Sequence, residues 1–117
     1  MIRELNLYKV YKHYKEYKDG EQALYVTTGV AHKVDAIPLK YDEQLLFNRT
    51  DEGYEDVLVD IYRVKDKYYY CCKVLEGDLV LYTALYGKRL SYVREKNEFI
   101  SRVPMADYRQ EFRFEEI

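Results

Sequence analysis

Short runs of β-branched and aromatic residues, separated by polar turns, dominate the chain and predict strands. Val57, Val59 and Ile61 recur at every second position, so they would share one buried face of a strand. The C-terminal tail alternates in the same way, with Phe112 and Phe114 set between charged residues. We expect strands over residues 22–30, 55–64, 67–75, 79–86, 90–94 and 111–116.

Turn residues mark the breaks between these runs. Lys65-Asp66 and Glu76-Gly77-Asp78 predict turns, and Gly87-Lys88 predicts a tight two-residue hairpin. The helix signal is weak, although residues 42–48 could form one or two helical turns. Five or more strands must close on themselves or pack as two sheets to bury their apolar faces. The pattern therefore predicts a mainly β domain with little helix, either a small antiparallel barrel or a compact sandwich.

Length and composition narrow the class of protein. A chain of 117 residues with a net charge of −2 fits one domain, residues 1–117, that is neither polyanion nor polycation. No apolar run approaches the roughly 20 residues of a membrane span, and Arg3, Glu4 and Lys9 argue against a signal peptide. The adjacent Cys71 and Cys72 would point to opposite faces of a strand, which favours reduced thiols. A cytoplasmic location is the expectation.

Charge is unevenly distributed along the chain. Residues 1–18 carry five Lys and Arg against two acids, and residues 88–113 carry seven against four. Residues 33–77 carry seven Lys and Arg against ten acids. The two flanks are thus basic and the middle is acidic, which favours an anionic ligand for the flanks.

Tyr residues followed by Lys recur near the N-terminus at positions 8, 11, 14 and 17. Rings that stack on bases, interleaved with ammonium groups that neutralise phosphates, are typical of single-strand binding. A period of three keeps neither a strand face nor a helix face, however. The alternative is that the Tyr residues divide between core and surface, with the Lys residues as edge charges.

Several motifs taken together resemble a known family. They are Tyr11-Lys12-His13-Tyr14-Lys15, Gly29-Val30-Ala31-His32, Tyr82-Thr83-Ala84-Leu85-Tyr86-Gly87, Tyr92-Val93-Arg94 and Arg113-Phe114-Glu115-Glu116-Ile117. In this order they resemble the small bacterial and phage family catalogued as domain of unknown function 1653. The resemblance implies a small, SH3-like β-barrel and no established activity. It covers the two flanks, so the acidic, Tyr-rich middle over residues 33–79 looks like an insertion.

This chain departs from the family pattern at three positions. Glu16 stands where the family has Gly, Tyr92 where it has Trp, and Glu95 where it has Pro. Tyr92 and Arg94 lie two residues apart and would share one strand face, where a ring beside a guanidinium suits a planar or anionic partner. Lys88 and Arg89 on the preceding turn would add positive charge. The alternative is that Tyr92 packs in the core and Arg94 covers it.

Catalytic and metal chemistry find little support in the sequence. A metal site would need ligands beyond His13 and His32, and either histidine could simply be hydrogen-bonded at a strand end. Pairing of the first two strands could instead bring both to an anionic ligand. A hydrolase using Cys71 or Cys72 with His32 is conceivable, but a Cys in an apolar strand is more often a core residue. We expect no enzyme, no cofactor and no metal.

We therefore predict a small binding module for an anionic ligand, a nucleotide or a nucleic acid, contacted through an aromatic and basic surface. The alternative is a protein-interaction module, phage-related, that uses the Tyr-rich and acidic surface. Exposed edge strands are compatible with a homodimer, and no membrane partner is expected. The candidate ligand-binding residues are Tyr11, Lys12, His13, Lys15, His32, Lys88, Arg89, Tyr92 and Arg94.

Overall fold

A computed structural model describes residues 4–16, 22–49, 57–103 and 110–117. The described chain is mainly β, with one short helix, α1 (Lys96–Phe99). Its strands belong to one hydrogen-bonded sheet with the order β5-β4-β3-β7-β6-β2-β1-β8. They span β1 (Val10–Glu16), β2 (Gln22–Lys33), β3 (Glu43–Arg49), β4 (Val57–Val64), β5 (Lys67–Tyr70), β6 (Leu79–Ala84), β7 (Ser91–Glu95) and β8 (Phe114–Glu116).

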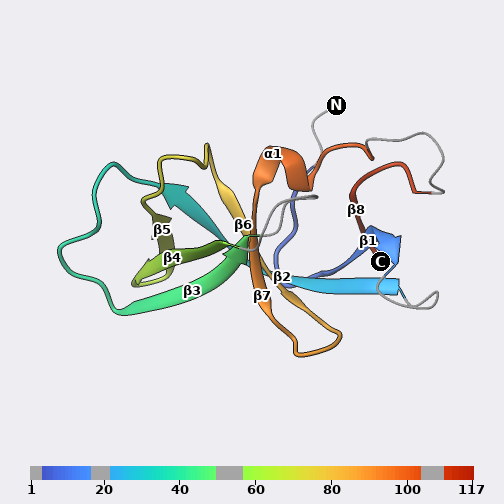
Figure 1. The fold of residues 1–117 in the computed structure, drawn as a ribbon, viewed down its shortest axis with the longest axis horizontal. Coiled ribbons are helices and arrows are strands. Elements are labelled where there is room, and N and C mark those ends of the chain that lie inside the picture. Colours follow the sequence, from blue (N-terminus) through green and yellow to red (C-terminus); the bar gives the residue numbers. More distant parts are fainter. Residues whose placement is uncertain (1–3, 17–21, 50–56, 104–109) are drawn as a thin grey trace.

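An additional pairing between β2 and β5 closes part of this sheet into a six-stranded barrel of β2, β5, β4, β3, β7 and β6. The β2–β5 and β3–β7 contacts are parallel, and the other pairs are antiparallel. Beyond the barrel, β1 and β8 extend the sheet from the first half of β2, on the right of Figure 1. The predicted mainly β architecture with a small barrel is confirmed.

The segment expected to form helical turns is a strand instead. β3 pairs with β4 along its whole length, from Glu43 opposite Arg63 to Arg49 opposite Val57. Phe47 is buried in the barrel and Leu45 packs against the same core, so tertiary burial decides the conformation over local propensity. The helical expectation for residues 42–48 was therefore wrong. With β4 and β5, this acidic middle segment supplies three of the six barrel strands.

The structure has two hydrophobic centres. The barrel core comprises Ala31, Phe47, Val59, Ile61, Tyr70, Leu75, Leu79, Leu81 and Val93. The aromatic cluster comprises Tyr11, Ala23, Tyr25, Val80, Tyr82, Ala84, Phe99 and Phe114. Strand β6 lies between the two, because its alternate residues face opposite sides of the sheet. This is why nearly every residue of β6 is buried.

A β-bulge lets β2 serve both centres. Thr27 pairs with Tyr82 and Gly29 pairs with Leu81, so Thr28 is an extra residue on β2. Before the bulge, Tyr25 faces the aromatic cluster, and after it Ala31 faces the barrel core. These two residues are six positions apart and would otherwise lie on the same face.

Gly29, just after the bulge, sits under a neighbouring ring. A Cβ at this position would lie 3.0 Å from Cε2 and 3.2 Å from Cδ2 of Tyr68 on β5, and 3.4 Å from Cδ1 of Leu81. Because β2 and β5 form the contact that closes the barrel, close approach at Gly29 supports closure.

We expect Gly29→Ala to lower the free energy of unfolding by about 1–3 kcal/mol, since the added methyl group overpacks this contact. Urea denaturation of the single variants and of the double variant with Tyr68→Val measures the coupling. In the Tyr68→Val background most of the Gly29→Ala cost should disappear. An equal cost in both backgrounds would show that the ring is not the obstacle.

Candidate functional site

Tyr11 and Tyr92, two of the predicted binding residues, belong to or border the aromatic cluster. The ring of Tyr11 packs edge-on against Phe99 at 5.3 Å, and its hydroxyl accepts a hydrogen bond from the Asn6 N–H at 3.0 Å. Tyr92 stacks on Tyr82, with ring centroids 5.8 Å apart and planes at 27°. Both rings therefore contribute to packing.

Tyr25 lies at the centre of this cluster. Its ring meets those of Tyr82, Tyr86 and Phe114 edge-on, at 5.3, 5.4 and 5.7 Å. Its hydroxyl shares a short hydrogen bond with the hydroxyl of Tyr86. Burial, reinforced by that hydrogen bond, raises the pKa of Tyr25 far above its ordinary value, so the phenol stays neutral. The cluster is thus a packed, uncharged core.

Arg94 is held inside the fold by a nearby carboxylate. Its side chain is only 6% exposed, and its Nη1 donates to Oε1 of Glu98 on α1 at 2.6 Å. The guanidinium also lies over the ring of Phe114, 5.5 Å from the centroid. Glu98 therefore neutralises the charge that the sequence pattern assigned to a ligand, and the ion pair ties α1 to β7.

The two histidines lie apart, so the alternative in which strand pairing brings His13 and His32 together is wrong. The β1–β2 register runs from Glu16 opposite Gln22 to Val10 opposite Val26, and therefore does not reach His32. His13 packs against Phe114 and Tyr14, with ring centroids at 4.7 and 4.6 Å. At the far end of β2, Nδ1 of His32 is 2.9 Å from Oδ1 of Asp78.

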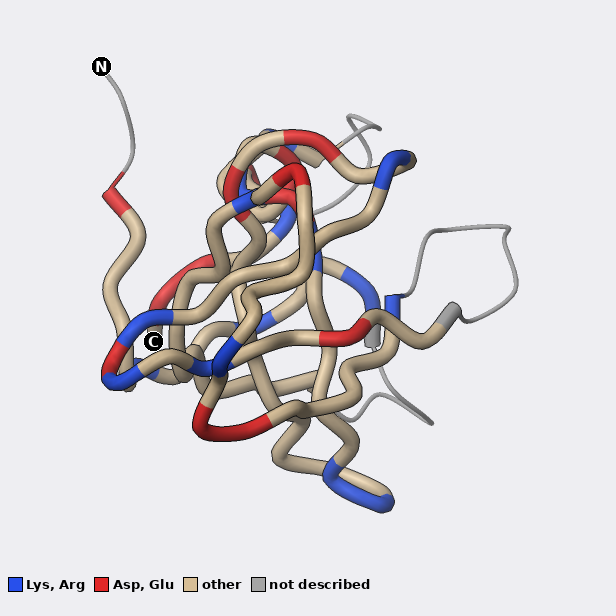
Figure 2. Tube along the Cα trace, turned by 90° about the vertical axis from the view of Figure 1, so that its left-hand side faces the viewer, with Lys and Arg blue, Asp and Glu red and all other residues tan. Residues whose placement is uncertain are grey.

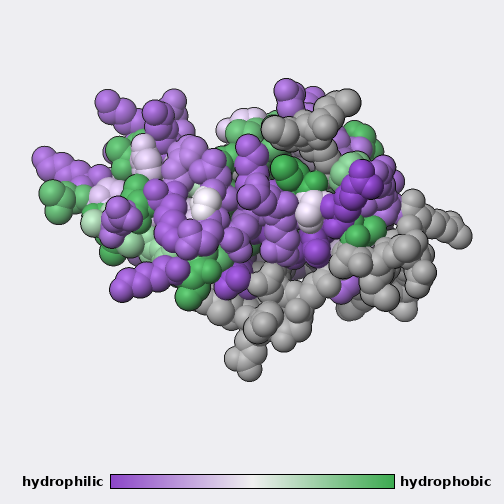
Figure 3. Space-filling view, turned by 90° about the horizontal axis from the view of Figure 1, so that it is seen from above, coloured by the Kyte–Doolittle hydropathy of each residue, from purple (hydrophilic) through white to green (hydrophobic). Residues whose placement is uncertain are grey.

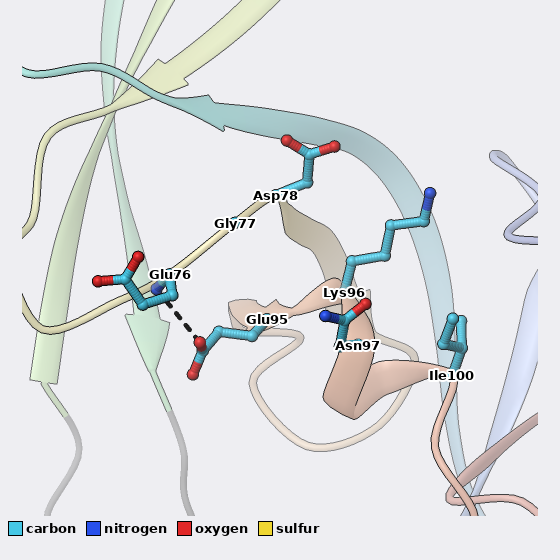
Figure 4. Close-up of a pocket in the computed structure, with 7 residues that line it drawn as sticks. All are labelled: Glu76, Gly77, Asp78, Glu95, Lys96, Asn97 and Ile100. Carbon is cyan, nitrogen blue, oxygen red and sulfur yellow. Dashed lines mark hydrogen bonds between the residues drawn. The ribbon is translucent and has the colours of Figure 1, made fainter.

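A cavity of about 340 Å³ opens beside Asp78, between the 76–78 segment and α1 (Figure 4). Its lining contains Glu76, Asp78 and Glu95 against a single cation, Lys96. The Glu76 N–H donates to Oε2 of Glu95 at 3.2 Å. Burial and these same carboxylates raise the pKa of the neighbouring Tyr70 to about 12. Because its lining is mainly negative, this cavity would repel an anionic ligand. Across the described residues, moreover, no three His, Cys, Asp or Glu side chains are grouped to hold a metal ion.

A sheet surface on the side opposite the aromatic cluster has a different character. Tyr11 and Tyr25 pair across β1 and β2 and face the cluster, so their neighbours in sequence face the other way. The register places Lys12 beside Leu24, and Val10 beside Val26, which pairs in turn with Thr83. Ser91 follows on β7. We name this surface the open face: Val10, Lys12, Leu24, Val26, Thr83 and Ser91.

The hairpin between β6 and β7 projects beside the open face (Figure 1) and forms the blue tip at the bottom of Figure 2. The Leu85 N–H donates to the Leu24 carbonyl at 2.9 Å, which fixes the base of the hairpin against β2. Lys88 and Arg89 at the tip are exposed. Neither side chain forms an ion pair with any residue in the described part of the chain.

Tyr8 is an exposed aromatic that the list of candidate residues left out. Tyr8 is 76% exposed, and its N–H donates to the Thr27 carbonyl at 2.7 Å, which places it beside β2 in the turn just before β1. Its φ of 59° lies in the left-handed region that a Tyr rarely occupies. The Tyr-Lys repeat includes Tyr8, but a period of three does not indicate which ring is exposed.

The remaining candidate, Lys15, lies at the other end of β1. Its ammonium sits over the ring of Tyr14, 5.7 Å from the centroid, and the Arg113 guanidinium lies 5.5 Å from the same centroid. Cys71 is exposed and Cys72 packs against the barrel core, and neither forms a disulfide. Of the nine candidates, only Lys12, Lys88 and Arg89 are brought to the open face and its hairpin.

Comparisons with protein-family models, curated proteins and solved structures found no match to this chain. The resemblance to domain of unknown function 1653 stays a prediction. In the described part of the chain, α1 is too short to cross a membrane.

Arg94→Ala should lower the free energy of unfolding by about 3 kcal/mol, because it leaves the Glu98 carboxylate without its buried partner. The double variant Arg94→Ala, Glu98→Ala should lose much less than the sum of the two single variants in urea denaturation. Additive losses would show that the ion pair contributes nothing to stability.

Proposed function

We propose that the protein is a small binding module for a phosphate-bearing anionic ligand, a nucleotide or a nucleic acid, held on the open face and the β6–β7 hairpin. The observation that carries this proposal is the pair Lys88 and Arg89, exposed at the hairpin tip without a carboxylate partner among the described residues. The charge of Arg94, by contrast, is neutralised by its ion pair with Glu98. An incoming anion meets the hairpin cations without displacing an acid.

Lys12 adds a second cationic position on the same surface. It lies beside Leu24, whose carbonyl accepts the hydrogen bond from Leu85 at the base of the hairpin. The apolar side chains of Leu24 and Leu85 therefore lie between Lys12 and the hairpin cations. Glu115 pairs with Lys12 on β8 and bounds the surface on its outer side. Such a strip offers apolar contact in the middle and positive charge on two sides.

The double change Lys88→Gln, Arg89→Gln should weaken binding of ATP or of a single-stranded oligonucleotide about tenfold at low salt, since two exposed charge contacts are lost. Titration calorimetry at two salt concentrations measures this. Binding by the unmodified protein should itself weaken with salt.

The matched control is Lys65→Gln, Lys67→Gln, at the β4–β5 turn and the first residue of β5. It removes the same charge, and Lys65 has a φ of 57° against 54° for Arg89. This control should bind like the unmodified protein. Equal losses of affinity in both double variants would show that binding depends only on the net charge of the protein. No binding at low salt would reject the proposal.

A protein-binding surface on the barrel is the second candidate. Six exposed apolar side chains come from the barrel strands and their connections: Ile37, Leu39, Tyr41, Leu46, Leu58 and Val74. Figure 3 shows hydrophobic groups at the left-hand end of the molecule, over this part of the barrel. Ile37, Leu58 and Val74 also line a groove of about 160 Å³. Exposed apolar patches of this kind mark protein interfaces.

A second copy of the chain is the partner that can be tested directly. If the barrel patch self-associates, sedimentation equilibrium should show a concentration-dependent dimer that Leu58→Glu, Val74→Glu dissociates. The matched control Leu85→Glu, Leu90→Glu changes two exposed leucines at the hairpin and should leave the dimer intact. A monomer at every concentration would reject self-association.

A further inference from the structure

We infer that the ligand of the open face is a single-stranded nucleic acid, with its phosphates at the two cationic sides and its bases over the apolar strip. This inference rests on the proposed function and specifies its ligand. Its argument depends on the spacing of the cations, the nature of the surface between them, and Tyr8.

The cations lie too far apart to serve one phosphate. Lys12 is on β1 and the hairpin follows β6, so β2 lies between them. Two inter-strand steps of about 4.8 Å separate Lys12 from Leu85 at the base of the hairpin by roughly 10 Å, and Lys88 and Arg89 lie further along the hairpin. The phosphates of a mononucleotide form one compact group, which would contact the cations on only one side of the strip. A strand that crosses β1, β2 and β6 presents successive phosphates to both sides.

The surface between the cations suits unstacked bases. Leu24 and Val26 on β2, with Val10 on β1, form an apolar floor of half-buried side chains. A duplex presents its phosphates outward and keeps its bases stacked inside, so it would leave this floor in contact with water or charge. A single strand can turn its bases onto the floor.

Tyr8 supplies an exposed ring next to β2, just before β1 begins. It precedes Val10 on β1, and its hydrogen bond to the Thr27 carbonyl fixes its backbone against β2. An aromatic ring that is 76% exposed gains little from the fold, and the left-handed backbone that presents it is costly for a Tyr. Stacking of the Tyr8 ring on a base would account for both its exposure and its left-handed backbone.

The test is fluorescence anisotropy with labelled single-stranded oligothymidine of about 12 nucleotides, a duplex of the same length, and ATP as competitor. The protein should bind the single strand more tightly than the duplex, and ATP should compete weakly. Tyr8→Ala should weaken strand binding roughly 5- to 100-fold, as expected for one lost base stack.

Variants at the same positions separate stacking from charge. Tyr8→Phe keeps the ring and should bind the strand like the unmodified protein. Lys12→Gln should weaken binding and make the slope of log affinity against log salt shallower by about 0.7. Circular dichroism confirms that each variant is folded.

Two results separate this inference from the proposed function. If ATP binds as tightly as the strand and Tyr8→Ala has no effect, the single-strand inference fails while an anion site at the hairpin stands. If neither strand, duplex nor ATP binds at low salt, both fail. Tighter binding of the duplex than of the single strand would also overturn the inference.

Discussion

The fold depends on the way β2 passes from one hydrophobic centre to the other. Its first half pairs with β1 and faces the aromatic cluster, and its last residues pair in parallel with β5 and close the barrel. Strict alternation would keep Tyr25 and Ala31 on one face, so the bulge at Thr28 is what permits both contacts. Buried Thr27, just before the bulge, donates its hydroxyl to the Asn6 carbonyl at 2.7 Å and ties the N-terminal segment to β2.

This division of β2 also determines which side chains remain available for binding. The aromatic cluster covers one face of β1 and the first half of β2, so Tyr11, Tyr25 and Tyr82 are occupied in packing. The opposite face of these strands carries the aliphatic residues Val10, Leu24 and Val26 together with Lys12. Because a buried aromatic layer packs behind this sheet, the proposed ligand contacts lie on its open side and on its projecting hairpin.

The sequence predicts the strands well and the chemistry of the site less well. Alternation locates β4, which buries Val59 and Ile61, and β6, which lies between the two centres. The strand expected over residues 111–116 begins only at Phe114. Alternation misses β3, where only Leu45 and Phe47 point inward and one of the two partners, β7, is distant in sequence, with Asn48 opposite Tyr92. The turn at Gly87-Lys88 is predicted from local turn chemistry alone: Gly87 has a φ of 55°, and the Arg89 N–H donates to the Tyr86 carbonyl at 3.0 Å. The connection between β6 and β7 nevertheless spans residues 85–90 rather than two residues.

The site itself could be only partly predicted, because exposure and charge pairing depend on tertiary contacts. Arg94 and Lys88 look equivalent in the sequence, yet α1 places Glu98 against one and the hairpin places the other in solvent. His32 gains Asp78 from a segment 46 residues away. Similarly, the period-three repeat cannot show that Tyr11 is buried and Tyr8 exposed, since that depends on where β1 begins to pair with β2.

Net charge is a poor guide to what this molecule attracts. The chain carries −2 overall, but many of its cations are neutralised locally. Arg63 pairs with Glu43, Lys33 with Glu76 and Arg102 with Glu111, at 3.3, 3.2 and 3.4 Å. Within a Debye length of about 8 Å at physiological salt, an approaching ligand senses the nearest charges rather than the sum. At the hairpin those nearest charges are Lys88 and Arg89, so an acidic protein can still present a local site for anions.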